Sequence, residues 1–285
     1  MKEKLLISFS GGRTSGYMTK MLMDNYSHLY EFIVVFANTV MEHPKTLEFV
    51  NNCDKYFGFN TVWVEADVVY EKNKGTKHKI VNYETCSRNG EPFEKVIKKY
   101  GIPNVKYPHC TRELKLSPIH SYMKSVGCPP TECKTAIGIR NDEVRRVSKT
   151  AEIRNIIYPL IDMFPADKQD VLDWWEDQEF DLGLSEWNGN CKLCYKKSTN
   201  KLFKQLDENP EFIEWHKRME ELYGGNGFKK DEDYRRVFFR KNISASQLEQ
   251  LHKDDRNNSA YAQREFQDFY ADGGCSESCE FLPTE

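Results

Sequence analysis

The chain has 285 residues; charged residues make up 30% of it, aromatic residues 13%, and the formal net charge is −3. This composition is typical of a globular protein and excludes a generally basic one, so any contact with nucleic acid would use local patches. There is no long uncharged apolar run and no signal-peptide pattern at the start, so we expect a cytoplasmic protein without membrane contact. The nine cysteines favour metal or redox use over a disulfide framework.

The first predicted element is a buried strand, the apolar run 5–9, which breaks at two glycines and resumes as an amphipathic helix. Backbone N–H groups converge at such a turn, and hydroxyl and guanidinium groups add donors for phosphate oxygens. The candidate anion-binding residues are Ser8, Ser10, Gly11, Gly12, Arg13, Thr14 and Ser15. The alternative is a plain strand-to-helix turn in which Ser15 is only a helix cap.

Strands and helices alternate along the next part of the chain. Residues 31–37 and 61–65 are further buried-strand candidates, and a helix follows Pro44 between them. The alternation predicts an α/β fold with a doubly wound parallel sheet, in which ligands bind at the carboxyl ends of the strands. The glycine turn and residues 38–43 both lie at such ends. Residues 66–106 are polar and mixed, with an exposed loop expected at 73–78.

A cationic segment follows at residues 107–120. Cys110 precedes a predicted helix whose first turn holds Arg112 and Lys115. A helix start with two cations nearby can hold phosphate or sulfate. A solvated charged helix explains the same pattern.

A third cluster occupies residues 136–146. A short apolar strand runs into Gly138, and Arg140, Glu143 and Arg146 follow in a turn or helix. Arginines at the carboxyl end of a strand suit the phosphates of a nucleotide, and Glu143 can orient one of them. Surface ion pairs are the alternative interpretation.

The second half of the chain begins with a predicted strand at 156–162 and a helix from about residue 166. We expect the tryptophans of that helix, Trp174 and Trp175, to pack in the core rather than to stack on bases. Further helices are predicted around residues 202–206 and 210–223.

The sequence pattern changes near residue 181. We therefore divide the chain into an α/β domain, residues 1–180, and a mainly helical, metal-bearing region, residues 181–285. Residues 235–241 combine basic side chains with two phenylalanines. A nucleic-acid-binding strip and a strand with charged flanks explain this segment equally well.

The cysteines indicate a metal site. A Cys-x-x-Cys spacing is a strong chelate signal that needs two more thiolates. The expected ligands are Cys110, Cys191, Cys194 and Cys279, with Cys275 as a substitute for the last. Cys128 and Cys133 form a second, looser pair. Spacing leaves zinc, an iron–sulfur cluster and a redox dithiol open.

Three motifs resemble one known superfamily. Residues 10–15 resemble the Ser-Gly-Gly-x-x-Ser pyrophosphate loop of the PP-loop ATP pyrophosphatases, which include phosphoadenosine phosphosulfate reductases and tRNA thiolases. Residues 110–118 and 138–146 resemble the Cys-x-x-x-Leu-Lys-x-x-Pro and Gly-x-Arg-x-x-Glu-x-x-Arg motifs of its reductase branch. The resemblance covers roughly residues 4–165. Arg13-Thr14 replaces the Lys-Asp of many members, and Val40 replaces a frequent glycine.

The resemblance implies a Rossmann-like fold of the PP-loop type and a set of ligands. The turn after the second strand would receive adenine and ribose. Its residues are Phe36, Asn38, Thr39 and Glu42, with Gly138 across the sheet. The implied cofactors are ATP or (phospho)adenylyl sulfate, with magnesium, and a [4Fe–4S] cluster rather than zinc. The expected partners are an adenine nucleotide, a tRNA or DNA acceptor, a sulfur donor protein and a second copy of the chain.

The resemblance also implies a reaction. ATP would adenylate an acceptor, and sulfur would then displace AMP. The residues expected to stabilise or organise the phosphates are Arg112, Lys115, Arg140, Glu143 and Arg146. One alternative is reduction of adenylyl sulfate or phosphoadenylyl sulfate, although the Glu-Cys-Gly-Leu-His end of those reductases is replaced here by a segment holding Cys275 and Cys279. The other alternative is a non-catalytic nucleotide- or nucleic-acid-binding module with a structural metal.

Overall fold

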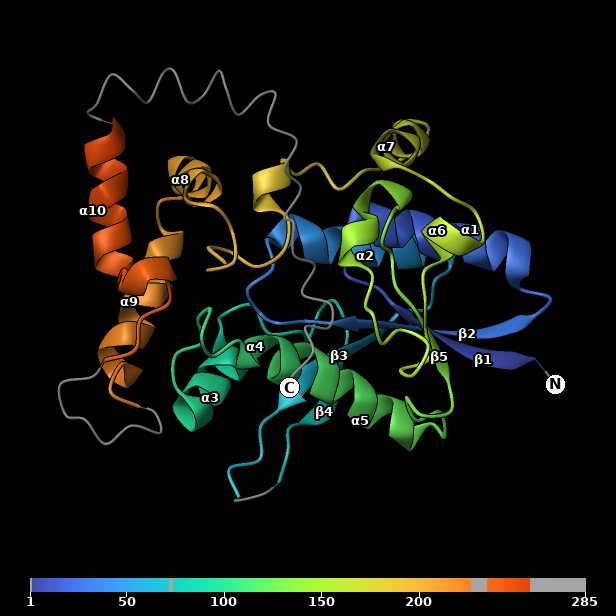
Figure 1. Cartoon of the computed structure of the whole chain (residues 1–285), viewed down its shortest axis with the longest axis horizontal. Helices are drawn as coiled ribbons and strands as arrows, with labels where there is room; N and C mark the ends of the chain where they lie inside the picture. The colour runs from blue at the N-terminus through green and yellow to red at the C-terminus, as the bar shows by residue number, and fades with distance from the viewer. Residues whose placement is uncertain (1, 72–73, 227–234, 257–285) are drawn as a thin grey trace.

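A six-stranded sheet forms the centre of the computed structural model, which describes residues 2–71, 74–226 and 235–256 (Figure 1). The strands are β1 (Glu3–Ser8), β2 (Tyr30–Ala37), β3 (Val62–Asp67), β4 (Lys77–Val81), β5 (Lys134–Ala136) and β6 (Ile156–Ile157). Their order is β4-β3-β2-β1-β5-β6, and every pair is parallel except β3 with β4. The predicted α/β class and its mostly parallel sheet are therefore confirmed.

Alternating apolar side chains bury both faces of the central strands. In β1, Leu5 and Ile7 pack in the core under one helical layer, whereas Leu6 packs in the core under the other. In β2, Phe36 faces the first core and Val35 the second. A strand that is buried on both faces has a continuous apolar sequence, and the sequence pattern therefore predicted the positions of these strands well.

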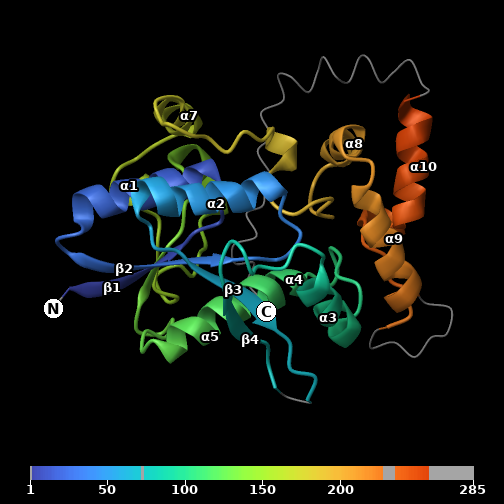
Figure 2. The same cartoon turned by 180° about the vertical axis from the view of Figure 1, so that it is seen from behind.

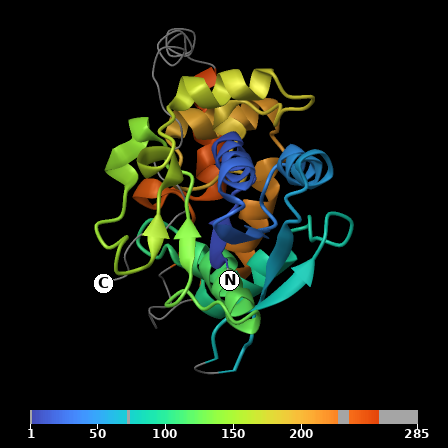
Figure 3. The ribbon, with the colours of Figure 1, turned by 90° about the vertical axis from the view of Figure 1, so that its right-hand side faces the viewer.

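Helices cover the two faces of this sheet (Figures 1 and 2). One layer contains α1 (Arg13–Tyr26), α2 (Pro44–Phe57), α6 (Pro159–Asp162) and α7 (Lys168–Glu176), and the other contains α3 (Glu91–Tyr100), α4 (His109–Thr111) and α5 (Ser117–Ser125). A π-helical turn, Arg112–Leu116, joins α4 to α5. Figure 3, which looks from the side of the N-terminus, shows the sheet between the two layers. None of the helices in the described part of the chain could span a membrane.

The remaining helices, α8 (Thr199–Glu208), α9 (Phe212–Tyr223) and α10 (Ala245–Arg256), lie together at one end of the molecule (Figure 2). They share a core with the α/β part: Leu202, Phe203 and Met219 belong to the same buried cluster as Val96 and Leu114. Helices drawn from both halves of the sequence therefore bury one continuous apolar surface.

Three local predictions need correction. The segment 156–162 is a strand only at Ile156–Ile157, because Pro159 opens the helix α6. The polar stretch 66–106 contains the antiparallel edge strand β4 and the helix α3. Neither was predicted, because the mixed composition of this stretch shows no clear apolar pattern. Cys110 lies within a helix that starts at His109 rather than before one.

The aromatic residues of the second half belong to the core. Trp175 is buried and donates its indole N–H to the Arg13 carbonyl at 2.9 Å, and Trp174 packs against the same core, as predicted. Phe238 and Phe239 are also buried. This burial contradicts the interpretation of residues 235–241 as a base-stacking strip, because stacking on bases needs exposed rings.

Candidate functional site

The glycine turn after β1 is shaped by steric exclusion. Gly11 has φ +75°, and a Cβ atom there would lie 2.9 Å from Thr46 Cγ2 and 3.1 Å from the Phe36 ring. Gly12 is the N-cap of α1 and is extended; a Cβ there would meet only Ser10 Oγ at 3.6 Å. The turn therefore requires glycine at position 11, while its second glycine faces open space at the helix start.

Two serines close this turn. The Ser15 hydroxyl accepts a hydrogen bond from the Ser10 amide at 3.2 Å and donates to the Gly12 carbonyl at 3.0 Å. The two hydroxyls lie 2.9 Å apart. Because the N-cap is Gly12, Ser15 is not the helix cap that the plain-turn alternative assumed. Its side chain instead fixes the loop that presents the N-terminus of α1.

The carboxyl end of β5 lies directly against the same loop. A Cβ on Gly138 would be 3.3 Å from Ser15 Cα, so glycine permits this close approach. β1 lies between β2 and β5. The chain runs outward from β1 through β2 and β3 on one side and through β5 and β6 on the other, so the topological switch point of the sheet lies between β1 and β5. Ligands of open α/β sheets bind at such a point.

Arg140, Glu143 and Arg146 form a connected group beside the switch point. Arg140 donates two hydrogen bonds to Asp142, at 2.8 and 3.0 Å, and one to Thr14 Oγ1 at 3.3 Å. Glu143 accepts from Arg146 and lies 3.6 Å from Arg140 Nη1. The Nε atom of Arg146 is buried and has no hydrogen-bond partner among the described residues. The three predicted side chains are therefore together, next to the helix start.

Arg13 points away from this group. Its guanidinium binds both carboxylate oxygens of Asp181, at 2.6 and 2.5 Å, and the Leu184 carbonyl at 3.3 Å. Lys45, at the start of α2, similarly donates to the Gly183 carbonyl at 2.9 Å. Two cations from the α/β part thus hold the segment that leads to the cysteine turn.

The turn after β2 is densely hydrogen-bonded. The side-chain amide of Asn38 donates to the Glu65 carboxylate at 2.7 Å and to the Ser87 carbonyl at 2.9 Å. Thr39 donates to the Glu42 carboxylate from its amide, at 3.0 Å, and from its hydroxyl, at 2.6 Å. Burial raises the pKa of Glu42, while Lys115 and Thr39 favour its charged form. This turn therefore has a buried acid at its centre.

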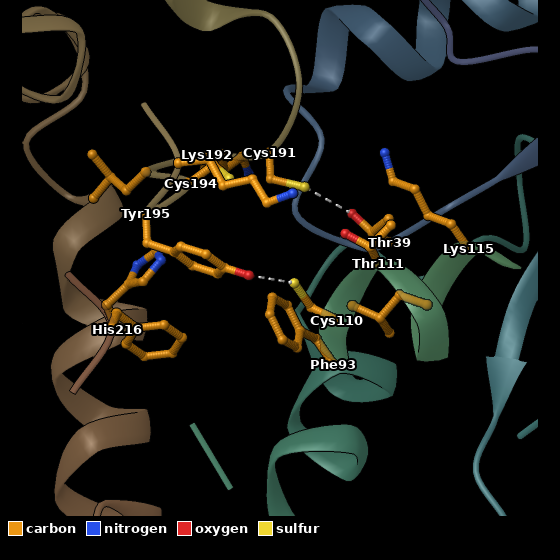
Figure 4. Close-up of a pocket in the computed structure, with 14 residues that line it drawn as sticks. Thr39, Phe93, Cys110, Thr111, Lys115, Cys191, Lys192, Cys194, Tyr195 and His216 are labelled. Carbon is orange, nitrogen blue, oxygen red and sulfur yellow. Dashed lines mark hydrogen bonds between the residues drawn. The ribbon is translucent and has the colours of Figure 1, made fainter. Parts of the chain in front are cut away.

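Three cysteines from distant parts of the chain line one cavity (Figure 4). Cys110 comes from α4, and Cys191 and Cys194 come from the Cys-x-x-Cys turn. Thr39 and Lys115 also line this cavity. The cavity measures about 30 Å³. This is far below the roughly 300–1,000 Å³ of pockets that bury a drug-sized ligand, so the cavity is too small to enclose a nucleotide.

Hydroxyl groups contact two of these sulfur atoms. Thr39 Oγ1 lies 3.3 Å from Cys191 Sγ, and Tyr195 Oη lies 3.3 Å from Cys110 Sγ. Lys197, which is buried, donates to the Cys191 carbonyl at 2.9 Å. Arg112 takes no part in the cavity wall; it is about half exposed and binds Glu113 at 2.7 Å.

Sequence reasoning missed the side chains that support the cysteine turn. Gln205, almost fully buried on α8, accepts from the Leu193 amide at 2.8 Å and donates to Asn188 at 3.2 Å. The available signal was a glutamine on the apolar face of a helix, between Leu202 and Leu206. A buried amide on such a face usually has a specific hydrogen-bond partner.

The predicted metal ligands are only partly assembled. Among the described residues, no group of three or more His, Cys, Asp or Glu side chains lies close enough together to hold a metal ion. Cys275 and Cys279 lie outside the described residues. Cys128 and Cys133, predicted as a second, looser pair, form a disulfide just before β5. No other disulfide joins two of the described residues, so this part of the chain has one disulfide and no disulfide framework.

Comparison with known proteins finds similar sequences and a similar structure. An uncharacterized nin region protein of Escherichia phage lambda is 29% identical over 282 residues, covering 97% of this chain and 94% of that protein. An uncharacterized protein of Methanocaldococcus jannaschii is 22% identical over 124 residues, covering 44% of this chain and 20% of that protein. The crystal structure of phosphoadenylyl-sulfate reductase from Candida auris, in its phosphate complex, aligns with a TM-score of 0.39 and 15% identity, covering 62% of this chain and 73% of that one.

The family assignment rests on a match over more than half of the sequence. The family model of the phosphoadenosine phosphosulfate reductase domain matches residues 4–176. These residues include the glycine turn, the turn after β2, the helix α4 that holds Cys110 and the arginine group after β5. The chain therefore belongs to the phosphoadenosine phosphosulfate reductase domain family, the branch of the PP-loop ATP pyrophosphatase superfamily that its motifs predicted.

Proposed function

We propose that this protein is a PP-loop enzyme that binds an adenine nucleotide at the carboxyl edge of its sheet and transfers sulfur beside it. The observation that carries the proposal is the contact between Thr39 and Cys191, at 3.3 Å. Thr39 belongs to a turn expected to hold the nucleotide, and Cys191 shares a cavity with two more cysteines. Sulfur chemistry and nucleotide chemistry would therefore take place in neighbouring sites.

The phosphates would bind at the start of α1. Gly12 leaves room there for backbone N–H groups to approach an anion, and the helix dipole favours negative charge. Arg140 and Arg146 lie across the switch point, where their guanidinium groups would compensate charge that develops on the phosphates. Glu143 would orient both arginines. A magnesium ion on the phosphates is consistent with this class of reaction.

The cysteine cavity suits a sulfur-bearing group. Three thiols line this cavity, and Lys115 and Lys192, which line it as well, provide a cation-rich surrounding for thiolates. For a [4Fe–4S] cluster, Cys110, Cys191 and Cys194 would supply three ligands, and Cys279 or Cys275 the fourth. Such a cluster, when bound, would supply sulfur or electrons next to the nucleotide; zinc would supply neither and would be structural.

The favoured reaction has two steps. An oxygen of the acceptor attacks the α-phosphorus of ATP, and pyrophosphate leaves. A hydrosulfide then attacks the activated carbon, the bond from carbon to the AMP oxygen breaks, and AMP leaves with the electron pair. A protein persulfide would instead leave a disulfide between the carbon and the protein, and a second thiol would have to cleave that disulfide to release the thiolated acceptor. A nucleic acid, tRNA or DNA, is the acceptor class that we favour. Lys115, near both the turn after β2 and the cysteines, would balance negative charge in the second step.

Reduction of adenylyl sulfate or phosphoadenylyl sulfate is the second candidate, because the family is named for this activity. A cysteine thiolate would attack the sulfonate sulfur, and the nucleotide would leave with the electron pair of the broken S–O bond. Cys275 or Cys279 would have to act as that nucleophile. A second thiol would then reduce the thiosulfonate and release sulfite.

A product assay distinguishes the two reactions. The protein is incubated separately with labelled ATP plus tRNA or DNA and a sulfide source, and with adenylyl sulfate plus a thiol reductant. AMP with pyrophosphate in the first mixture supports thiolation, and sulfite in the second supports reduction. Gly12→Val, which fills the open face of the turn, should abolish either product. Neither product, together with no nucleotide affinity, would refute the proposed function.

The cluster has its own test. Protein purified without oxygen should be brown and contain about four irons per chain. Replacing Cys110, Cys191 or Cys194 singly by alanine should remove most of the iron. Cys53→Ala should not, because Cys53 lies on the buried face of α2, in the core. Colourless protein that contains zinc would exclude the iron–sulfur cluster and leave the nucleotide site untouched.

A further inference from the structure

We propose that Thr39 is a positioning residue that joins the turn Cys191–Cys194 to the turn after β2, so that nucleotide bound at one turn restrains the other. The proposal rests on the proposed function, because it takes the turn after β2 as part of the nucleotide site. It adds a physical link between that site and the cysteines, and it names the side chain that makes the link.

The first part of the link is a backbone pairing. Cys191 and Glu42 pair as an isolated antiparallel bridge, and the Lys192 amide donates to the Met41 carbonyl at 2.7 Å. A β-bridge fixes both the separation and the relative direction of the two segments. The cysteine turn therefore cannot shift relative to the turn after β2 without breaking this pairing.

The second part is the Thr39 hydroxyl. It donates to the Glu42 carboxylate at 2.6 Å and lies 3.3 Å from Cys191 Sγ, while the Thr39 amide donates to the other carboxylate oxygen at 3.0 Å. Thr39 is 1% exposed and Glu42 7%. Polar contacts shielded from water in this way are strong and directional. One hydroxyl thus connects the Glu42 carboxylate with the sulfur atom of Cys191. Figure 4 shows its contact with Cys191.

The turn after β2 is also held in one strained shape. Val40 has φ +64°, a left-handed conformation that is unfavourable for a β-branched residue. The Val40 amide is held by Asn38 Oδ1 at 3.1 Å, and Asn38 in turn donates to Glu65 and to the Ser87 carbonyl. Strain of this kind persists only where surrounding contacts over-determine the backbone. A ligand that restrains this turn would therefore restrain the segment paired with it.

Hydrogen exchange measures this coupling directly, whether or not a metal occupies the cysteines. The Lys192 amide reports on the pairing, since its hydrogen bond to Met41 must break before exchange. Saturating ATP should slow its exchange by about 5-fold or more, the lower end of usual allosteric couplings. In Thr39→Val the hydroxyl is lost but the shape is kept, and the ATP effect should fall below about 2-fold. Thr39→Ser should restore it.

Controls keep the outcomes distinct. Calorimetry first establishes that ATP binds and at what concentration it saturates. The Gly58 amide, which donates to Asp54 at the end of α2, should be unaffected in every variant. If Thr39→Val does not fold, Thr39→Ala removes the same hydroxyl, leaves the cysteines in place and should give the same loss.

The results separate this inference from the proposed function. No ATP affinity in the wild-type protein would refute both. ATP binding without slower exchange at Lys192 would refute the inference alone. A full ATP effect in Thr39→Val would also refute it, because the hydroxyl would then carry none of the coupling.

Discussion

The glycine turn after β1 and the cysteine turn at 191–194 are held by different kinds of interaction. In the first, the left-handed residue is Gly11, for which this conformation costs little. In the second, Asn190 and Leu193 are left-handed, and a leucine in that region is strained. Gln205, twelve positions away on α8, offsets this strain by accepting from the Leu193 amide. The motif of the first turn therefore predicts its backbone geometry. The Cys-x-x-Cys motif of the second turn predicts a chelating pair but not the distant glutamine that holds its backbone.

The largest expected effect tests the first half of this comparison. Gly11→Ala adds a Cβ at φ +75°, within 3.1 Å of three neighbouring side chains. The left-handed conformation and the overpacking together should lower the free energy of unfolding by about 2–5 kcal/mol. Urea denaturation measures the loss. Gly12→Ala is the matched control and should change stability by less than about 1 kcal/mol, because space is open there. Equal losses would contradict the steric account of the turn.

The second prediction concerns the packing beneath the cysteine turn. His216 on α9 lines the cavity, and burial lowers its pKa from 6.5 to about 4. Between these two values the unfolded chain binds a proton that the folded chain does not, so stability is lost as pH falls from about 6.5 to about 4 and is unaffected above that range. For this one side chain the loss should approach about 3 kcal/mol at pH 4.

His216→Phe should flatten the acid limb of a plot of unfolding free energy against pH. His28 is exposed, so His28→Asn is the matched control and should leave the curve unchanged. An unchanged acid limb in His216→Phe would show that the histidine is accessible to protons in the folded protein. The second region would then be less tightly packed than the structure indicates.

A third prediction concerns the distant support of the cysteine turn. Gln205→Ala leaves the Leu193 amide and the Asn188 side chain without their partner, which should cost about 1–3 kcal/mol. Exchange of the Leu193 amide should become faster. Gln250 on α10 is exposed, and Gln250→Ala should change stability by less than about 0.5 kcal/mol. A neutral Gln205→Ala would mean that the turn holds its own shape.

The smallest effect concerns the link between the two regions. Asp181→Asn removes the ion pair with Arg13. The Arg13 side chain is 23% exposed and the Asp181 side chain is 38% exposed. Because both groups are solvated, the free energy of unfolding should fall by about 0.2–1 kcal/mol. The loss should shrink in about 1 M salt, where charges are screened. Asp24→Asn, which removes an exposed pair with Lys20, provides a comparison. A loss of several kcal/mol would indicate a buried, structural pair instead.

Short-range patterns sufficed for much of the molecule. The apolar runs predicted β1, β2 and β3 to within about two residues, because strands buried on both faces have continuous apolar sequences. Trp175 was expected in the core and is there. The edge strand β4 was missed, since its side chains are mostly exposed and polar. Phe238 and Phe239 remained ambiguous because a pair of rings beside arginines has the same pattern in a core as on a surface.

The sequence by itself determined the α/β class, the glycine turn and the family, because each is recognised from apolar runs or motifs that are themselves only a few residues long. Only the tertiary structure decided which side chains meet across the chain. Thr39 reaches Cys191, Gln205 supports Leu193, and Arg13 binds Asp181. These contacts depend on how α8 and the cysteine turn pack against the sheet, and packing of distant segments leaves no periodic signal in a single sequence.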